Sequence, residues 1–429
     1  MHLDFCLARG AAISMFLAAM SLAPRELSAA EIAASRLRFI VETDAGGDPD
    51  DEQSLVRFLL YANEWDVEGI IANRARARDG ENRNKERTGL GIVRALVKAY
   101  GACWTNLAQH DARYPRADAL LARTVAGYDD TDDGVKLIIS AVDRDDPRPI
   151  WYADWGSDRG SGINNLRRAL DRVFRERDAR GYAKFKSALR IISYDQFAEH
   201  NTRPPDWKFW LNTFEPPRDG KRWYHRFSAL TATAGGFNLQ RDALAGHGAL
   251  GALYPTNTTH WQKEGDTMTF LYLVPTGLNE PEQPIWGSWA GRYGVREDAP
   301  GKRWYWANQA DAWKGATNRD NTLARWAADL QNDFRARLDW CVKPFAAANH
   351  PPRVALNGTQ GIDVLRLHAQ PGTAVRLDAS GSSDPDRHSL RYEWFYYPEP
   401  STYRGHVNVA GSRSEIATVQ VPIFTLSRP

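Results

Sequence analysis

Four aspartates are crowded into one short stretch of this sequence, directly after an apolar run. The stretch reads "FIVETDAGGDPDDEQSLVRFLLYANEWDVEGIIA", and four of its five aspartates, Asp44, Asp48, Asp50 and Asp51, lie close together near its start. Carboxylates this close repel one another, so the turn is either fully solvated or binds a cation. Because Ca²⁺ takes about six to eight oxygen ligands, a cluster of this density suits a hard cation.

A purely structural role accounts for part of the same cluster. Asp48 is a favourable N-cap and Pro49 a favourable first residue of a helix. Asp50 and Asp51 would then lie in the first helical turn, where the helix dipole favours anions. Capping needs only one carboxylate, whereas this turn offers several from two elements. Both the capped helix and the cation site are therefore hypotheses at this point.

The segments around the cluster predict an α/β domain with a mostly parallel sheet. "LRFIVET" and "DVEGIIA" favour strands, and "DEQSLVRFLLYAN" between them has helical spacing, so the three form a β-α-β unit. The cluster then lies at the carboxyl end of a parallel strand, where open α/β sheets bind ligands. Further strands are expected in "RPIWYADWG", "ALRIISYD" and "TFLYLVP", and further helices in "ERTGLGIVRALVKAYG", "NNLRRALDRVFRERD" and "TLARWAADLQNDFRARLDW".

The chain divides into three predicted segments. Residues 1–30 place an arginine before an apolar run and end in Ser-Ala-Ala, which predicts a cleaved signal peptide and an exported protein, periplasmic or extracellular. Residues 37–345 carry the α/β pattern. Residues 350–429 follow a Pro-Pro break and show short alternating strands with Asp, Gly, Ser and Pro turns. They predict a small β-sandwich whose last residues do not resemble a closing strand pair.

Charge and hydropathy exclude some classes of partner. The formal net charge of +2 gives no electrostatic basis for binding nucleic acid or an anionic membrane. No segment after the signal peptide reaches the roughly 18 apolar residues of a membrane span. Cys103 and Cys341 remain after signal removal, and two cysteines so far apart predict neither a zinc site nor a definite disulfide. The sequence does not indicate an oligomeric state.

The stretch also resembles the first motif of the nucleoside hydrolase superfamily. It is most similar to a bacterial family of cellulose-binding proteins with a nucleoside hydrolase-like domain. The resemblance continues through "DRDDPRPIWYADWG", "KEGDTMTFLYLVPTGLNEPEQPIWGSWAGRYG" and "LQNDFRARLDW". It closes with "NHPPRVALNG" and "LDASGSSDPD", which resemble an immunoglobulin-like or polycystic-kidney-disease-like sandwich. The resemblance implies a nucleoside hydrolase-like sheet flanked by helices, with a calcium site and a sugar-binding cleft.

The resemblance also implies roles for individual residues. It implies a calcium ion held by Asp44, Asp51, Asp266 and the backbone carbonyl of Asn164, with Asp44 also accepting a proton from water. It implies that Asp50 bonds a ribose hydroxyl. Asn165, which follows Asn164, is assigned to substrate binding. The sequence has two more residues between Asp44 and the Asp50–Asp51 pair than the family motif has.

Three other features of the sequence each have two interpretations. Asp195 follows the strand "ALRIISY" and could bond substrate hydroxyls, or could belong to an ordinary strand-ending turn. Trp286 and Trp289 could form a carbohydrate platform or a packed aromatic cluster. For the basic stretch from Arg74 to Arg87, a solvated loop is favoured over a phosphate site.

We therefore expect an exported hydrolase-like protein that uses calcium and a metal-activated water on a glycosyl bond. The bond is N-glycosyl, as in a nucleoside, or belongs to a carbohydrate. The alternative is a non-catalytic cellulose- or polysaccharide-binding protein that retains the fold. A structural surface protein is a third hypothesis, and it requires the acidic cluster to bind nothing.

Overall fold

A computed structural model describes residues 36–47, 49–78, 85–156, 165–193, 210–212, 238–256, 262–297 and 304–423. The predicted signal peptide lies outside these residues, as do Asp48, Asn164 and Asp195. By their contacts, the described residues divide into a large unit and a small C-terminal unit.

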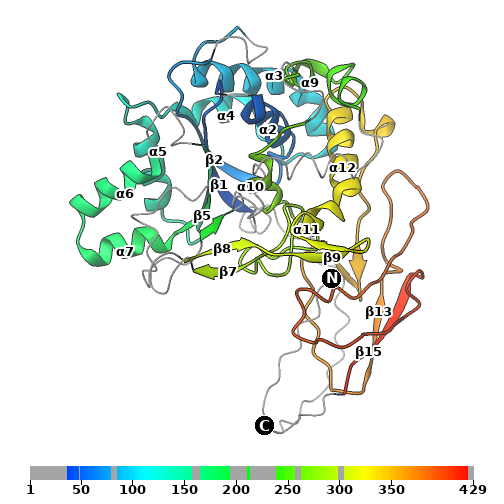
Figure 1. Cartoon of the computed structure of the whole chain (residues 1–429). Helices are drawn as coiled ribbons and strands as arrows, with labels where there is room; N and C mark the ends of the chain where they lie inside the picture. The colour runs from blue at the N-terminus through cyan, green and yellow to red at the C-terminus, as the bar shows by residue number, and fades with distance from the viewer. Residues whose placement is uncertain are drawn as a thin grey trace. The chain divides into compact units, whose positions relative to one another are not determined.

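The large unit is built on one sheet, whose described strands have the order β3-β2-β1-β4-β5-β6-β8-β7 (Figure 1). All neighbouring pairs are parallel except β7 with β8. The mostly parallel sheet and its first β-α-β unit confirm the prediction. The strands are β1 (Leu37–Thr43), β2 (Trp65–Ala72), β3 (Thr124–Ala126), β4 (Ile150–Trp155), β5 (Leu189–Ser193), β6 (Trp210–Asn212), β7 (Tyr293–Glu297) and β8 (Trp304–Asn308).

Helices cover both faces of this sheet, as expected for parallel strands buried on both sides (Figure 1). Phe39 and Val41 of β1 pack into one apolar core, and Ile40 between them packs into the other. The first core is covered by α2 (Pro49–Leu60), α3 (Gly89–His110), α9 (Gly248–Ala252), α10 (Thr267–Leu271) and α12 (Ala327–Trp340). The second is covered by α5 (Asp133–Asp143), α6 (Asn165–Glu176) and α7 (Ala179–Ser187).

The remaining elements of the large unit are short. They are α4 (Ala117–Ala122), η1 (Gln240–Leu244), a hairpin of β9 (Asp311–Trp313) and β10 (Ala316–Asn318), α11 (Asn321–Ala324) and η2 (Phe345–Ala347). No helix among the described residues is both long enough and apolar enough to cross a membrane.

One expected strand is a helix. "TFLYLVP" was expected to be a strand, but Thr267–Leu271 form α10 and the chain then turns. The turn starts upstream, where the amide of Thr267 donates to the carbonyl of Glu264 and that of Thr269 to the carbonyl of Asp266. A short buried apolar run has no period that separates strand from helix, so the sequence pattern alone could not predict α10.

The amino ends of β1 and β2 are held by paired charges. Arg38 of β1 is buried, and its Nε lies 2.8 Å from Oε1 of Glu68 on β2. Arg144 binds the same carboxylate. Beside them, the Arg148 guanidinium lies 2.6 Å from carboxylate oxygens of both Asp66 and Asp146. Arginines thus neutralise the acids at this end of the sheet.

The small unit takes in Pro275–Glu280 together with Asn349–Pro429. Its described strands form two antiparallel sheets, β11 (Ala355–Leu356) with β12 (Thr359–Gln360), and β13 (Ala374–Asp378) with β15 (Ile416–Gln420) and β14 (Val409–Ala410). A small core of Leu377, Val407, Ala417 and Val419 lies beneath them. Small antiparallel sheets were predicted, whereas their assignment as an immunoglobulin-like sandwich remains a prediction.

Candidate functional site

The strand order places a ligand-binding edge beside the acidic turn. From β1 the chain adds β2 and β3 on one side and later returns to place β4 on the other side. This reversal of direction is the switch point at which open α/β sheets bind ligands, at the carboxyl ends of the strands. Asp44 directly follows β1, and a Cβ atom on Gly156, just after β4, would lie 3.4 Å from its Oδ1.

Three carboxylates converge at the start of α2. Asp50 and Asp51 lie in the first turn of this helix, and Asp266 is the residue that precedes α10. One oxygen from each lies within 4.8 Å of the others. The three side chains are at most 2% exposed. The expected pair of Asp51 and Asp266 therefore does come together in the fold, with Asp50 as its third member.

Residues of α2 hold the segment that carries Asp266. Oε1 of Gln53 accepts hydrogen bonds from the amides of Lys263 and Glu264, at 2.8 and 3.2 Å. One turn further, the Arg57 guanidinium forms a fully buried ion pair with Glu264, with a 3.0 Å bond from Nη2 to Oε1. Asp266, two residues beyond Glu264, is thus positioned by the same helix that carries Asp50 and Asp51.

Negative charge is concentrated around Asp51. Burial raises its pKa well above the usual range, and the neighbouring carboxylates Asp266, Asp44 and Asp50 raise it further. Oδ1 of Asp51 accepts hydrogen bonds from the hydroxyl of Thr43 and, at 3.1 Å, from the amide of Asp44. The end of β1 therefore fixes the position of this carboxylate, but its neutral donors do not offset the negative charge of the neighbouring carboxylates.

Asp44 makes an ion pair that the sequence did not suggest. Nη2 of Arg74, just beyond β2, donates to its Oδ2 at 2.6 Å. Arg74 is buried, whereas the other described basic residues of the stretch from Arg74 to Arg87 are exposed, as a solvated loop predicts. Gly46 has a φ of +93°, and a Cβ on Gly47 would lie 2.8 Å from Nη2 of Arg74. The two glycines thus let the turn bend and let Arg74 approach.

Another buried carboxylate, that of Glu42, lies near the end of β1. It accepts hydrogen bonds from the Tyr152 hydroxyl, from Nδ2 of Asn73 at 3.2 Å, and from Nδ2 of Asn165 at 2.8 Å. Its pKa is raised by burial, against the opposing effect of these donors. Asn165, predicted to bind substrate, is fully buried and also donates to the carbonyl of Gly127 at 2.9 Å.

The donor set fits a hard cation. Asp50, Asp51 and Asp266 supply carboxylate oxygens only, and their spacing suits one ion with Ca–O distances of about 2.3–2.6 Å. Thiol and imidazole ligands, which zinc prefers, are not part of this group. Asp44 lies beside the three but shares its Oδ2 with Arg74.

The two tryptophans of the proposed carbohydrate platform lie mostly in the interior. Trp286 is 4% exposed, and Trp289 is partly buried against the large apolar core. An indole ring packed in this way offers little surface for a sugar to stack on from solvent. Their burial favours the packed aromatic cluster, the alternative that the sequence left open.

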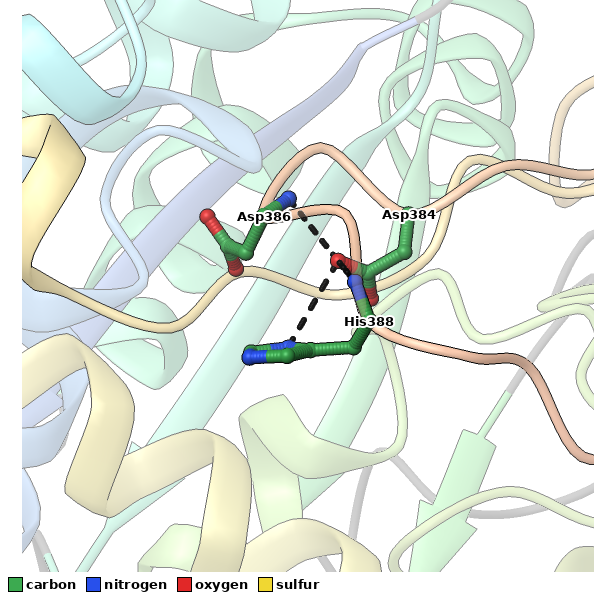
Figure 2. A group of neighbouring side chains, drawn as sticks. All are labelled: Asp384, Asp386 and His388. Carbon is green, nitrogen blue, oxygen red and sulfur yellow. Dashed lines mark hydrogen bonds and ion pairs between the residues drawn. The ribbon is translucent and has the colours of Figure 1, made fainter.

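Asp384, Asp386 and His388 form another group in the small unit (Figure 2). Oδ1 of Asp384 accepts hydrogen bonds from the amides of Asp386 at 2.8 Å and of His388 at 3.2 Å. The Asp386 carboxylate accepts a hydrogen bond from the amide of His350, and its Oδ1 lies 2.8 Å from Nδ1 of the His350 ring. These bonds stabilise the turn, as side chains of turn aspartates commonly do.

Comparisons with known proteins agree with this architecture. Residues 38–293 match the family described as "Cellulose-binding Sde182, nucleoside hydrolase-like domain". Residues 374–427 match "Cellulose-binding protein Sde0182, C-terminal domain". No match was found among the curated proteins.

Two solved structures are similar to the chain. One is a nucleoside hydrolase-related hypothetical protein from Saccharophagus degradans associated with carbohydrate metabolism, with 31% identity, a TM-score of 0.72, and coverage of 90% of this chain and 92% of that chain. The other is an inosine-uridine preferring nucleoside hydrolase from Bacillus anthracis, with 12% identity, a TM-score of 0.31, and coverage of 70% and 99%. The first of these supports the nucleoside hydrolase-like fold.

Proposed function

The chain belongs to the family of cellulose-binding proteins with a nucleoside hydrolase-like domain, and on this basis we propose that it hydrolyses a glycosyl bond with calcium. The observation that carries the proposal is the convergence of Asp50, Asp51 and Asp266 within 4.8 Å at the carboxyl edge of the sheet. A structural cap does not require three buried carboxylates. Cellulose-derived sugars or other carbohydrates are the proposed substrate class. Nucleosides, from which a base would be the leaving group, are the alternative substrates.

The proposed roles are those that the resemblance to nucleoside hydrolases implies. Asp51 and Asp266 would hold the calcium ion, with Asp44 and the carbonyl of Asn164 as further ligands. When bound, calcium would supply ligation for sugar hydroxyls and would acidify a water molecule. Asp44 would accept the proton, and Asp50 would orient a sugar hydroxyl.

The enclosed position of these groups supports this chemistry. The carboxylates are buried, so their interactions with a bound sugar would be screened little by water. The hydrogen bonds of Glu42 with Asn73 and Asn165 would hold the end of β1 and the start of α6 in position. The residue that would protonate the leaving group is not among these assignments.

A second function, non-catalytic binding of cellulose or another polysaccharide, is favoured by one specific observation. The carboxylate that would take the proton, Asp44, shares Oδ2 with the Arg74 guanidinium at 2.6 Å. A proton acceptor that is already engaged in a charge-assisted hydrogen bond is a weaker base. In this alternative the acidic cluster binds calcium for structural stability, and the carbohydrate is bound but not cleaved.

Titration of calcium into chelator-treated protein tests the site directly. We expect micromolar binding in the wild type and its loss in Asp51→Asn, which keeps the shape of the side chain but removes its charge. Asp118→Asn is the matched control, because Asp118 is an exposed acid on α4. Wild-type protein that binds no calcium would refute the metal-dependent hydrolase.

Activity and retention on cellulose then separate the two functions. Release of nitrophenol from aryl glycosides, or of base from nucleosides, supports hydrolysis if it depends on added calcium. If the ion pair with Arg74 only makes Asp44 a weaker proton acceptor, Arg74→Met should increase any such activity. Calcium binding and cellulose retention without turnover of any substrate class would instead support the binding protein.

Export is a separate proposal. The predicted signal peptide would be removed near Ala30, so that the mature chain starts near Glu31. Sequencing the N-terminus of protein recovered from the periplasm or medium of an expressing bacterium tests this. Recovery only from the cytoplasm, with residues 1–30 intact, would contradict it.

A further inference from the structure

Two cysteines that are far apart in the sequence lie side by side in the fold. Cys103 belongs to α3, and Cys341 directly follows α12. Each residue is 2% exposed, and both are free thiols. The thiol of Cys341 donates to the carbonyl of Arg337 at 3.8 Å, and the two thiols lie close enough that each shifts the pKa of the other. Neither residue takes part in the acidic site.

One face of α3 holds the segment around Cys341 in place. Nδ2 of Asn106 donates to the carbonyl of Cys341 at 3.0 Å, and Nε2 of His110 bonds the carbonyl of Lys343 at 2.8 Å. The His110 ring also stacks on Trp340, with centroids 5.1 Å apart and an interplanar angle of 8°. Residues 103, 106 and 110 lie along the same face of the helix. The contacts therefore keep Cys341 opposite Cys103.

A glycine makes room for the two side chains. A Cβ on Gly248, at the start of α9, would lie 3.0 Å from Sγ of Cys103 and 3.6 Å from Cβ of Cys341. Both cysteines thus flank the same small residue, which itself has a φ of +76°. Close packing around a thiol pair limits how far the two sulfurs can move apart.

We propose that Cys103 and Cys341 are a redox modification site, which an organic disulfide such as oxidised glutathione converts into an intramolecular disulfide. The sulfur of Cys103, as a thiolate, attacks one sulfur of the organic disulfide and releases one thiolate of the small molecule. The thiolate of Cys341 then attacks the sulfur of Cys103 and releases the second. The protein loses two protons and two electrons, and the organic disulfide is reduced to two thiols.

In the native fold, Cys103 is the more acidic of the two thiols. The neighbouring Cys341 thiol, helped by the backbone amides of Leu250 and Ala249, lowers the pKa of Cys103 to about 6, although burial opposes this. Thiolates, not thiols, are the nucleophiles in disulfide exchange. Because both thiols are buried in the native fold, we expect exchange during folding, before α12 has packed on α3.

The test is oxidative refolding of the full chain, in a Cys6→Ser background, with oxidised and reduced glutathione. Proteolytic mapping under non-reducing conditions should then find a peptide joining Cys103 to Cys341, lighter by two hydrogen atoms than its separate parts. The linkage closes a long loop, so the oxidised protein should unfold on the order of 5 °C higher than the reduced protein.

Single variants supply the control. Cys103→Ser and Cys341→Ser should each show the same unfolding midpoint with and without reductant. If either variant fails to fold, mapping of the parent protein still decides the question. The proposal is overturned if both cysteines are alkylated after oxidative refolding. It is also overturned if Cys103 accumulates as a mixed disulfide with glutathione, because the second exchange step would then be geometrically blocked.

Discussion

At the scale of single residues, the positioning of Asp266 depends on one buried ion pair. Arg57 and Glu264 are both fully buried, and Arg57 also donates to Oε1 of Gln331 at 2.9 Å and lies 3.6 Å above the Phe334 ring. Tyr254, Gln262 and Thr267 donate further hydrogen bonds to the Glu264 carboxylate. Such a pair tolerates replacement of both partners better than the loss of one.

Arg57→Met should therefore lower the free energy of unfolding by about 3–5 kcal/mol, because Glu264 would remain buried without its countercharge. Denaturation in urea, followed by circular dichroism, measures this loss. Arg172→Ala is the control: Arg172 pairs with Glu176 on the surface of α6, and its removal should cost no more than about 0.5 kcal/mol. Equal effects of the two substitutions would contradict the structural importance of the buried pair.

The acidic cluster predicts opposite effects of one substitution under two conditions. Asp51→Asn removes one of several crowded negative charges while keeping an oxygen for the hydrogen bonds from Thr43 and Asp44. In chelator, the variant should unfold at a higher temperature than the wild type, because like-charge repulsion is reduced. With calcium, the order should reverse, because only the wild type gains from binding. A variant less stable than the wild type in chelator would argue against electrostatic strain.

At the scale of elements, the two ends of the central strands differ in how their charges are balanced. At the amino ends, Arg38, Arg144 and Arg148 neutralise the acids of β2 and of the loop before β4. At the carboxyl ends, three carboxylates face one another. One end is thus built for stability, and the other has the electrostatics of a binding site.

The amino end should contribute to acid sensitivity. Hydrogen bonds from the Arg148 side chain lower the pKa of Asp146 from 3.8 to about 2. A carboxylate with a lowered folded-state pKa stabilises the fold above its unfolded-state pKa, and this stability is lost as the pH falls through the folded-state value.

Asp146→Asn should therefore lower the urea midpoint above pH ~4, and the difference from wild type should shrink toward pH ~2. Urea denaturation across this range measures the effect. Asp145→Asn, at the exposed neighbouring position, is the control and should follow the wild type. A difference that does not vary with pH would mean that the charge of Asp146 is not involved.

Much of this element-level architecture could be predicted from the sequence. The β1-α2-β2 pattern and the alternation of Phe39, Ile40 and Val41 between two cores follow from side-chain periodicity. The partnership of Arg57 with Glu264 and that of Arg74 with Asp44 could not be predicted, because each joins charges from segments brought together only by folding. The helix at Thr267–Leu271 was missed because five buried residues carry too little periodicity.

At the scale of the whole molecule, the acidic site and both apolar cores of the sheet come from the large unit alone. Asp44, Asp50, Asp51 and Asp266 all lie within Ala33–Val274. No described member of those two cores lies beyond Ala348. The small unit has its own, much smaller core.

A chain that ends at Ala348 should therefore fold and should bind calcium with the affinity of the full chain. Calorimetric titration of the two proteins side by side measures this. If cellulose retention is lost in the shortened chain while calcium binding is kept, the carbohydrate contact belongs to the small unit. Loss of calcium binding in a shortened chain that is still folded would mean that the small unit supports the site.

Because Pro275–Glu280 belongs to the small unit, this unit is not encoded by one continuous stretch of the gene. A gene fragment that encodes only residues 349–429 omits this hexapeptide, in which Gly277 lies close to the carbonyl of Ile362. We therefore expect this fragment to fold poorly when it is fused end to end with another domain. It should become more resistant to protease when the hexapeptide is added as a separate peptide. The two units would then have to be transferred together, because the small unit needs a segment that lies within the sequence of the large unit.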